Sequence, residues 1–167
     1  SLAPIKNKPF LSYIFDYLIS QNIREVNLLV GYKSNQIFNF YGDQYKNLSI
    51  FYFKEEYQLG TGGAVKNFAL TKNSKRYSLI INGDTYFPFD LYKFLNTIPN
   101  NMDSIVCTKV SDSSRYGSLI ISKKNLLKNF EEKSYKNQSY INAGIYYLDL
   151  KKIADFRMKK FSLELDY

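Results

Sequence analysis

The stretch Gln58-Leu59-Gly60-Thr61-Gly62-Gly63-Ala64-Val65 contains three glycines within four residues, directly before the helix-forming run 66–70. Glycines at such a turn let the backbone approach a ligand closely and leave N–H groups available to bind it, as in a nucleotide site. A flexible turn between a strand and a helix has the same sequence features, because short glycine motifs often match by chance. The rest of the chain must decide between the two readings.

The composition indicates one compact domain spanning residues 1–167. Of these residues 45% are hydrophobic and 17% are aromatic, enough to bury a sizeable core. No stretch reaches the apolar length of a membrane span, and the N-terminus lacks the pattern of a signal peptide. Since Cys107 is the only cysteine, no internal disulfide can form. We therefore expect a cytoplasmic protein with no membrane partner.

The charge and the missing residue types narrow the chemistry. The formal net charge is +8, but Lys and Arg are scattered from Lys6 to Lys160 rather than gathered into one basic block. The charge alone favours neither nucleic acid nor a small polyphosphate ligand, and a solvated Lys-rich surface explains it most simply. We expect no nucleic-acid partner. The absence of histidine removes the commonest general base and the commonest zinc ligand, and a single cysteine excludes a cysteine metal cluster. Catalysis must therefore depend on carboxylates, Lys, Arg, backbone N–H groups or an oxygen-liganded metal.

Helical and strand patterns alternate in the first third of the chain. A helix is predicted from Pro9, with apolar residues at three- and four-residue spacing, and Ser34 resembles the N-cap of a second helix that Gly42 ends. Strands are predicted at Glu25–Val30 and Leu48–Phe53. This order predicts an α/β, Rossmann-like fold: a mostly parallel sheet with helices on both faces.

The apolar run Tyr77–Ile81 is typical of a buried strand, and Asn82-Gly83-Asp84-Thr85 follows it directly. An Asn-Gly pair also suits a hairpin. Against a hairpin, Pro88 interrupts the return and Asp90 suits a helix N-cap. At the carboxyl end of a central parallel strand, Asp84 could hold Mg²⁺ against phosphate oxygens. Its alternative role is to cap its own turn.

Further strands are predicted at Asp103–Val110, Tyr116–Ile121 and Ile141–Leu148, with a helix over Leu150–Arg157. Gly117 suggests close approach by a ligand or another backbone segment. The triplet at 131–133 could equally be an exposed charged segment. The last residues resemble the start of a further element.

Six short motifs follow one another along the chain: Leu2–Ile5 with Lys8–Leu11, Leu59–Ala64, Asn82–Thr85, Arg115–Gly117, Phe130–Lys133 and Ile141–Gly144. In this order and spacing they resemble the motifs of the sugar-phosphate nucleotidylyltransferases. Within that family, the closest likeness is to the guanylyltransferases that act on a heptose 1-phosphate in bacterial surface-polysaccharide synthesis.

The resemblance implies transfer of a nucleotidyl group from a nucleoside triphosphate, GTP in the closest members, to a sugar 1-phosphate with release of pyrophosphate. It also implies a role for each matching position. The base pocket would be lined by Gly60, Thr61, Gly62 and Gly63. Asp84 would be a catalytic residue that holds Mg²⁺, and Lys133 would be a catalytic residue that contacts the sugar phosphate. The sugar would be surrounded by Gly117, Glu132 and Asn142.

The sequence also departs from the family pattern. The family begins with a Gly-Gly-x-Gly-Thr-Arg loop and a Lys that hold the triphosphate, and Ser1 stands just after that position. A second metal-binding Asp belongs after Tyr167, and Gln58 replaces a common Pro. We expect the central portion of a whole enzyme, which as it stands could be inactive. The alternative is a catalytically inert domain that binds a nucleotide or nucleotide-sugar. A homo-oligomer is compatible with either.

Overall fold

The computed structural model describes residues 2–72, 74–99, 101–113, 116–131 and 137–167. The helices are α1 (Phe10–Ser20), α2 (Ser34–Tyr41), α3 (Gly60–Ala69), α4 (Leu91–Thr97) and α5 (Leu150–Asp155). The strands are β1 (Pro4–Ile5), β2 (Lys8–Pro9), β3 (Glu25–Val30), β4 (Gln44–Tyr45), β5 (Leu48–Lys54), β6 (Tyr77–Ile81), β7 (Ser104–Asp112), β8 (Ser118–Ile121), β9 (Leu127–Glu131) and β10 (Asn137–Asp149).

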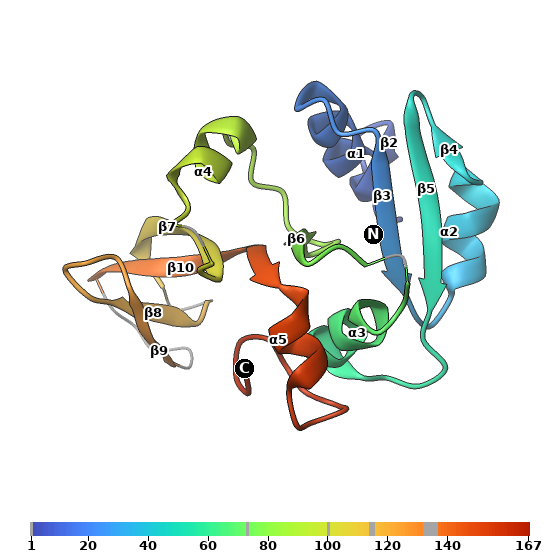
Figure 1. The fold of residues 1–167 in the computed structure, drawn as a ribbon. Coiled ribbons are helices and arrows are strands. Elements are labelled where there is room, and N and C mark those ends of the chain that lie inside the picture. The colour runs from blue at the N-terminus through green and yellow to red at the C-terminus, as the bar shows by residue number, and fades with distance from the viewer. Residues whose placement is uncertain (1, 73, 100, 114–115, 132–136) are drawn as a thin grey trace.

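Strands β3 and β5 form a parallel pair, in register from Glu25 opposite Ser49 to Val30 opposite Lys54. Helix α2 connects them, and the short strand β4 extends the sheet on the far side of β5. In Figure 1 the two strands stand side by side, with α1 and α2 close by and α3 near their lower ends. This confirms the predicted strand–helix–strand unit.

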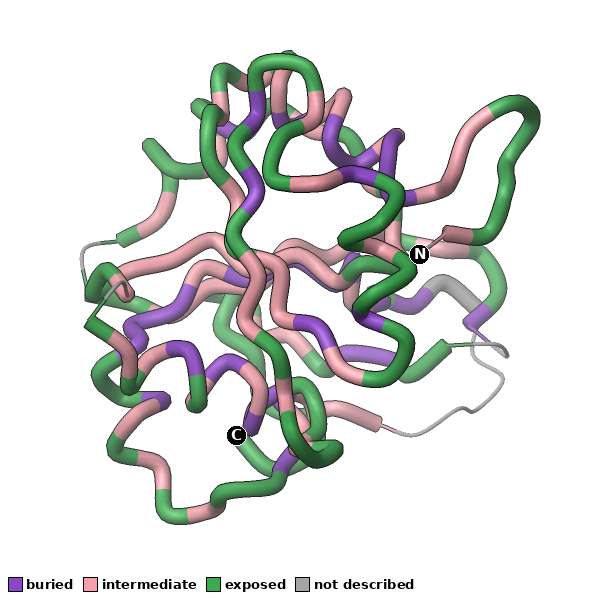
Figure 2. Tube along the Cα trace, turned by 90° about the vertical axis from the view of Figure 1, so that its right-hand side faces the viewer, coloured by how far each residue is buried: buried purple, intermediate pink, exposed green. Residues whose placement is uncertain are grey.

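Alternate residues of these strands enter two different cores. Val26 and Leu28 pack among the residues of α1 and α2, whereas Leu29 and Phe53 pack against the cluster of α3 and α5. Helices therefore cover both faces of the parallel pair, as the sequence predicts. Figure 2 shows the buried positions in the interior of the trace and exposed positions on its outer turns.

The larger sheet is built around the 13-residue strand β10 and is antiparallel. One side of β10 pairs with β7, and the other pairs with β8 at Tyr140 and then with β6 from Ile145 onward. Here the structure differs from the mostly parallel sheet that the sequence predicts. Among the described residues, only β3 and β5 pair in parallel. After β7 and the β8–β9 hairpin, the chain runs back as β10 alongside β6 in the opposite direction, so that pair is antiparallel.

Strand β6 nevertheless lies in the same layer as β3 and β5. Ile80 packs in the core of α3 and α5, and Ile81 packs in the core of α1 and α2. Within the part of the chain that the structure describes, β6 is hydrogen-bonded to β10 alone and is therefore an edge strand. The prediction that Asp84 follows a central parallel strand was thus wrong in its pairing.

The local predictions mostly hold. Asn82–Thr85 leads out of β6 into α4 without a hairpin, and the Asp90 carboxylate accepts a hydrogen bond from the Lys93 N–H at 2.9 Å as an N-cap. Gly42 ends α2 at a positive φ of 61°. The cap of α2 was predicted one residue late, because Lys33 takes the N-cap position in a left-handed conformation and Ser34 is already helical.

Candidate functional site

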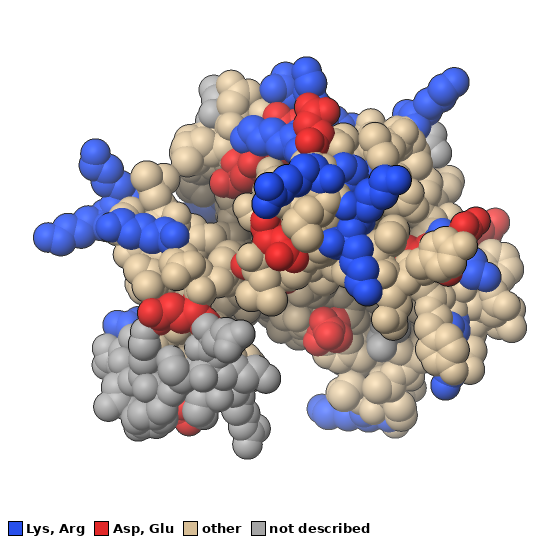
Figure 3. All heavy atoms as spheres, turned by 90° about the horizontal axis from the view of Figure 1, so that it is seen from below, with Lys and Arg blue, Asp and Glu red and all other residues tan. Residues whose placement is uncertain are grey.

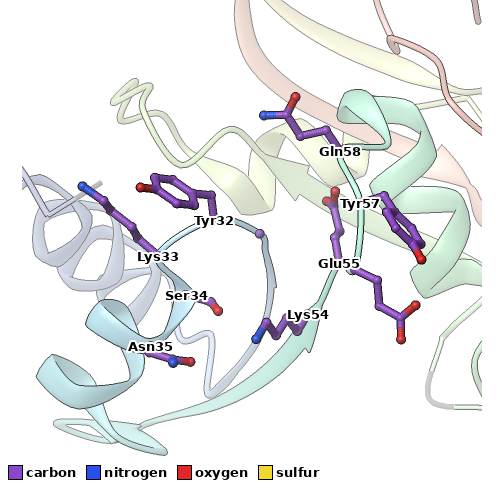
Figure 4. A pocket seen from close by; sticks show the side chains of 10 residues that line it. Tyr32, Lys33, Ser34, Asn35, Lys54, Glu55, Tyr57 and Gln58 are labelled. Carbon is purple, nitrogen blue, oxygen red and sulfur yellow. The ribbon is translucent and has the colours of Figure 1, made fainter.

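A pocket of about 480 Å³ opens at the carboxyl ends of β3 and β5, where α/β sheets place their ligands. The view in Figure 4 shows its side chains coming from two stretches: the β3–α2 turn with the start of α2, and the end of β5 with the segment that leads to α3. Tyr32 and Tyr57 are largely exposed at its rim, so aromatic surface is available to a planar ligand. The lining residues are Gly31–Asn35 and Lys54–Gln58.

The glycine stretch lies next to this pocket and forms the first turn of α3. Gly60 and Thr61 are exposed, whereas Gly62 and Gly63 are buried. The N–H groups of Gly62 and Gly63 both donate to the carbonyl oxygen of Phe161, at 3.0 and 3.2 Å. The expectation that these glycines leave N–H groups open to a ligand is therefore wrong for this pair.

A side chain at any of these three glycines would collide with the segment around Phe161. The nearest atoms are the Phe161 carbonyl oxygen, 2.5 Å from a Cβ at Gly60, and the Phe161 ring, 2.2 Å from a Cβ at Gly62. For Gly63 the obstacle is the Lys159 carbonyl at 2.5 Å. In this structure the glycines thus serve a close approach between chain segments, and their part in nucleotide binding stays a prediction.

The loop that carries Asp84 is anchored on β10. The Asn82 N–H donates to the Gly144 carbonyl at 2.8 Å, and a Cβ at Gly144 would lie 2.9 Å from the Thr85 hydroxyl. Gly144 has a positive φ of 66° and lies in a bulge where the register of β10 shifts. This bulge holds the Asp84 loop and the neighbouring Asn142 together.

Asp84 itself is exposed, and within the described ranges its carboxylate makes no hydrogen bond or ion pair. The same residues include no group of three or more His, Cys, Asp or Glu placed to hold a metal. Mg²⁺ is commonly held by one or two carboxylates together with substrate phosphates and waters. An exposed single carboxylate at the end of β6 fits that kind of site, with Asp84 as the protein ligand.

A chain of hydrogen bonds runs from Asn142 to the glycine turn. The Asn142 side-chain N–H donates to the Tyr146 hydroxyl at 2.6 Å, and that hydroxyl donates to Oε1 of Glu164. Oε2 of Glu164 accepts from the Thr61 hydroxyl at 3.1 Å and from the Ser162 hydroxyl at 2.6 Å. Asn142, which is predicted to bind the sugar, and Thr61, which is predicted to line the base pocket, are thus connected through the Glu164 carboxylate.

Tyr146 and Glu164, the two titratable groups in this series of hydrogen bonds, both have shifted pKa values. Burial, and then the hydrogen bond to Glu164, raise the pKa of Tyr146 well above its usual range, so its hydroxyl keeps its proton. Burial by itself would raise the pKa of Glu164, but hydrogen bonds from Ser162, Tyr146 and Thr61 outweigh it and lower that pKa. Glu164 is therefore ionised at neutral pH.

Sequence analysis missed Tyr146 and Glu164. Tyr146 is one of several apolar residues in a strand pattern, and Glu164 is 103 residues away from Thr61 in sequence. The signal that could have found them is the Ser162–Glu164 spacing, since a Ser two residues before a carboxylate can form a local hydrogen-bonded turn.

The remaining predicted sugar residues are only partly placed. Gly117 faces backbone, because a Cβ there would lie 3.2 Å from the Glu131 carbonyl, which confirms the expected close approach. The Ser118 hydroxyl donates to the Glu131 carboxylate at 3.3 Å. Glu132 and Lys133 lie outside the described residues, as does Arg115.

The surface charge is mixed on the face that Figure 3 shows. There, Lys and Arg side chains lie among Asp and Glu and uncharged residues. Among the described residues, no helix combines the length and apolar character that a membrane crossing requires.

Comparison with known proteins agrees with this geometry. The sequence profile of the family described as nucleotidyl transferase matches residues 1–166. The D-glycero-alpha-D-manno-heptose 1-phosphate guanylyltransferase of Campylobacter jejuni is 39% identical over 164 residues, which cover 98% of this chain and 72% of that protein. The enzyme of the same name from Aneurinibacillus thermoaerophilus is 41% identical over 170 residues, covering 99% of this chain and 73% of its own length.

Among solved structures, HddC from Yersinia pseudotuberculosis complexed with GMP-PN superposes with a TM-score of 0.91 at 35% sequence identity. The match covers 99% of this chain and 74% of HddC. Together with the layered arrangement around β3, β5 and β6, this similarity confirms the fold that the motifs predicted.

Proposed function

This chain belongs to the nucleotidyl transferase family, and on that premise we propose that it is a guanylyltransferase that acts on GTP and a heptose 1-phosphate. Nucleotidyl transfer to a sugar phosphate follows from the two relatives, whose similarity extends over nearly the whole chain. That similarity is the observation that carries the proposal. The guanine base and the heptose are the finer assignments, and the names of the relatives and the GMP-PN bound to HddC support them.

In the proposed reaction, a phosphate oxygen of the heptose 1-phosphate attacks the α-phosphorus of GTP in line. A new P–O bond joins the GMP unit to the sugar phosphate, while the bond to the β-phosphate breaks and pyrophosphate leaves. The attacking oxygen is already anionic at neutral pH, so no general base is required. The work of the protein is to position two anions and offset their repulsion.

We propose that the nucleotide is bound near the start of α3, beside the pocket at the carboxyl ends of β3 and β5. The exposed Gly60 and Thr61 are the parts of the glycine turn that a base can reach. The tyrosine rings at the pocket rim add surface on which a purine could stack. Gly62 and Gly63 would then act indirectly, by letting α3 pack against the segment at Phe161.

On the sugar side, Asn142 is proposed to hydrogen-bond the heptose hydroxyls from the β10 bulge, and Gly117 and Glu132 are proposed as further sugar-binding residues. Lys133 is proposed to contact the sugar phosphate. Asp84 is proposed to hold Mg²⁺, which when bound would offset the negative charge of the phosphates. The backbone contact between Asn82 and Gly144 supports this arrangement, because it holds the loop that carries Asp84 against the strand that carries Asn142.

The test is an assay of the full-length protein with each nucleoside triphosphate, Mg²⁺ and a panel of sugar 1-phosphates. We expect pyrophosphate release with GTP and a heptose 1-phosphate, and much slower release with the other pairs. Release with a different base or sugar would correct the finer assignment alone. Silence across the panel, with a nucleotide or nucleotide-sugar still bound, would favour a catalytically inert binding domain instead.

We also propose that the product serves bacterial surface-polysaccharide synthesis in the cytoplasm. The support is chemical: a guanosine diphosphate sugar is an activated donor for a glycosyl transfer. Loss of the heptose from the cell-surface polysaccharide in a deletion strain, restored by the wild-type gene, would test this role.

A further inference from the structure

Glu164 occupies the junction between the two halves of the proposed site. Its Oε1 accepts from the Tyr146 hydroxyl on β10, and its Oε2 accepts from the Thr61 hydroxyl at 3.1 Å in the first turn of α3. Glu164 is half-buried, and Tyr146 is only 4% exposed. Among the described residues, its carboxylate makes no hydrogen bond with a residue that lines the pocket, and the reaction proposed above gives it no role.

The chemistry of a carboxylate fixes the direction of each hydrogen bond around it. An ionised Glu164 can only accept, so the Tyr146 hydroxyl must donate its proton to it. The lone pairs of the Tyr146 oxygen are then available to the Asn142 N–H, which donates at 2.6 Å. The Tyr146 hydroxyl thus has one defined orientation.

That orientation is passed on to the Asn142 amide. With its N–H directed at Tyr146, the Asn142 carbonyl oxygen faces the other way and accepts from the Gly144 N–H at 2.7 Å. The Asn142 side chain is therefore held at both ends, in the bulge that also anchors the Asp84 loop. A buried network with every member satisfied gives a single, rigid arrangement.

On the other side, Glu164 orients Thr61. The Thr61 hydroxyl donates to Glu164, so its oxygen is free to accept the Leu163 N–H, which it does at 2.9 Å. Ser162 reinforces the carboxylate with a second donated bond at 2.6 Å. The first turn of α3 is thereby fixed to the segment 161–164, next to the exposed Gly60.

We propose that Glu164 is a positioning residue for both substrates. Through Tyr146 it sets the amide orientation of Asn142 toward the sugar phosphate, and through Thr61 it fixes the glycine turn toward the nucleotide. This inference rests on the proposed function. It predicts that the effects on the two substrates can be separated. Loss of the Tyr146 hydroxyl affects binding of the sugar phosphate alone, and loss of the Glu164 carboxylate affects binding of both substrates.

The experiment measures kcat and the two KM values in the full-length protein for Tyr146→Phe, Glu164→Gln and wild type. For Tyr146→Phe we expect the KM for the sugar phosphate to rise about tenfold, with the KM for GTP within about twofold of wild type. For Glu164→Gln, whose amide brings a donor to hydroxyls that need an acceptor, both KM values should rise about tenfold.

A double-mutant cycle separates positioning from a merely structural role. In an Asn142→Ala background, Glu164→Gln should raise the KM for the sugar phosphate no further, because its effect acts through Asn142, while the KM for GTP still rises. The matched control is Tyr167→Phe, which removes a tyrosine hydroxyl that donates to the Asp103 carboxylate at 3.3 Å. It should leave both KM values unchanged.

Independent effects in the cycle, or equal changes in Tyr146→Phe and the control, would overturn the inference while the proposed function stands. A wild-type protein that forms no nucleotide-sugar would overturn both. If Glu164→Gln fails to fold, Tyr146→Phe alone decides: an unchanged KM for the sugar phosphate contradicts the inference, and a selective rise supports it.

Discussion

Gly62 lies directly against Phe161: its N–H donates to the Phe161 carbonyl at 3.0 Å, and a Cβ at Gly62 would lie 2.2 Å from the Phe161 ring. The two residues are 99 positions apart in sequence and join the start of α3 to the segment that follows α5. Phe161 is 3% exposed and belongs to the core that α3 and α5 share. The absence of a side chain at Gly62 is thus a packing requirement.

Gly62→Ala should destabilise the fold for this reason. The added methyl group cannot fit unless the Phe161 ring or the helix shifts, and overpacking of this kind costs about 1–3 kcal/mol in the free energy of unfolding. Denaturant unfolding of the variant and the wild type measures the difference. Gly31→Ala is the matched control, because a Cβ there meets nothing within 4 Å and its effect should stay below about 1 kcal/mol. Equal stability of the two variants would contradict the packing role.

Asp84→Asn should reduce turnover while leaving the fold intact. The carboxylate is exposed and makes no hydrogen bond or ion pair within the described ranges, so the free energy of unfolding should be nearly unchanged. Loss of a proposed Mg²⁺ ligand should lower kcat by about a hundredfold or more and raise the Mg²⁺ concentration needed for half-maximal rate. The control is Asp90→Asn, because asparagine caps a helix as well as aspartate does. Full activity in Asp84→Asn would show that the metal is held elsewhere.

Acid should weaken the fold partly through Asp149. Burial by itself would raise its pKa, but hydrogen bonds from Arg76 and the Lys151 N–H outweigh it and lower the pKa below the ordinary 3.8. A lowered folded-state pKa means that the stabilisation is complete above pH 3.8 and is lost as the pH falls through the folded value. Asp149→Asn can still cap α5 but cannot titrate.

Unfolding free energies measured at several pH values from 6 down to 2, in steps of about one unit, test this prediction. The wild type should be more stable than Asp149→Asn at the upper end, and the difference should shrink as the pH falls below 3.8. A difference that is independent of pH would contradict the role of the charge.

Local signals in the sequence predicted much of the fold. The spacing of Leu11, Ile14 and Leu18 predicted α1, and Glu25–Val30 was predicted at the bounds that the structure has. Pro88 and Asp90 correctly ruled out a hairpin after β6. In each case the deciding physics lies within a few neighbouring residues.

Long-range pairing was the part that local signals could not predict. The antiparallel contact of β6 with β10 depends on where a strand 60 residues later returns, and nothing in Tyr77–Ile81 specifies a direction for its neighbour. The same holds for the bonds that Gly62 and Gly63 give to Phe161. Their N–H groups were expected to meet a ligand, and a distant carbonyl takes them instead.

Local motifs likewise predicted some residues of the site, and long-range contacts determine the others. Motif resemblance selected Asp84, Asn142 and the glycine turn, and the structure packs the loop that carries Asp84 against the Gly144 bulge, which begins at Asn142. Tyr146 and Glu164 connect this group to Thr61, but they act through hydrogen bonds between distant segments. The Ser162–Glu164 spacing indicates a local turn, but it does not indicate which distant residues bond to that carboxylate.

Transfer of label from GTP tests the central claim most directly. The full-length protein is incubated with Mg²⁺, a heptose 1-phosphate and GTP labelled at either the α- or the γ-phosphate. Attack at the α-phosphorus predicts that the α label enters a guanosine diphosphate heptose and the γ label enters pyrophosphate. An α label that never joins the sugar, or a γ label that does, would contradict the account.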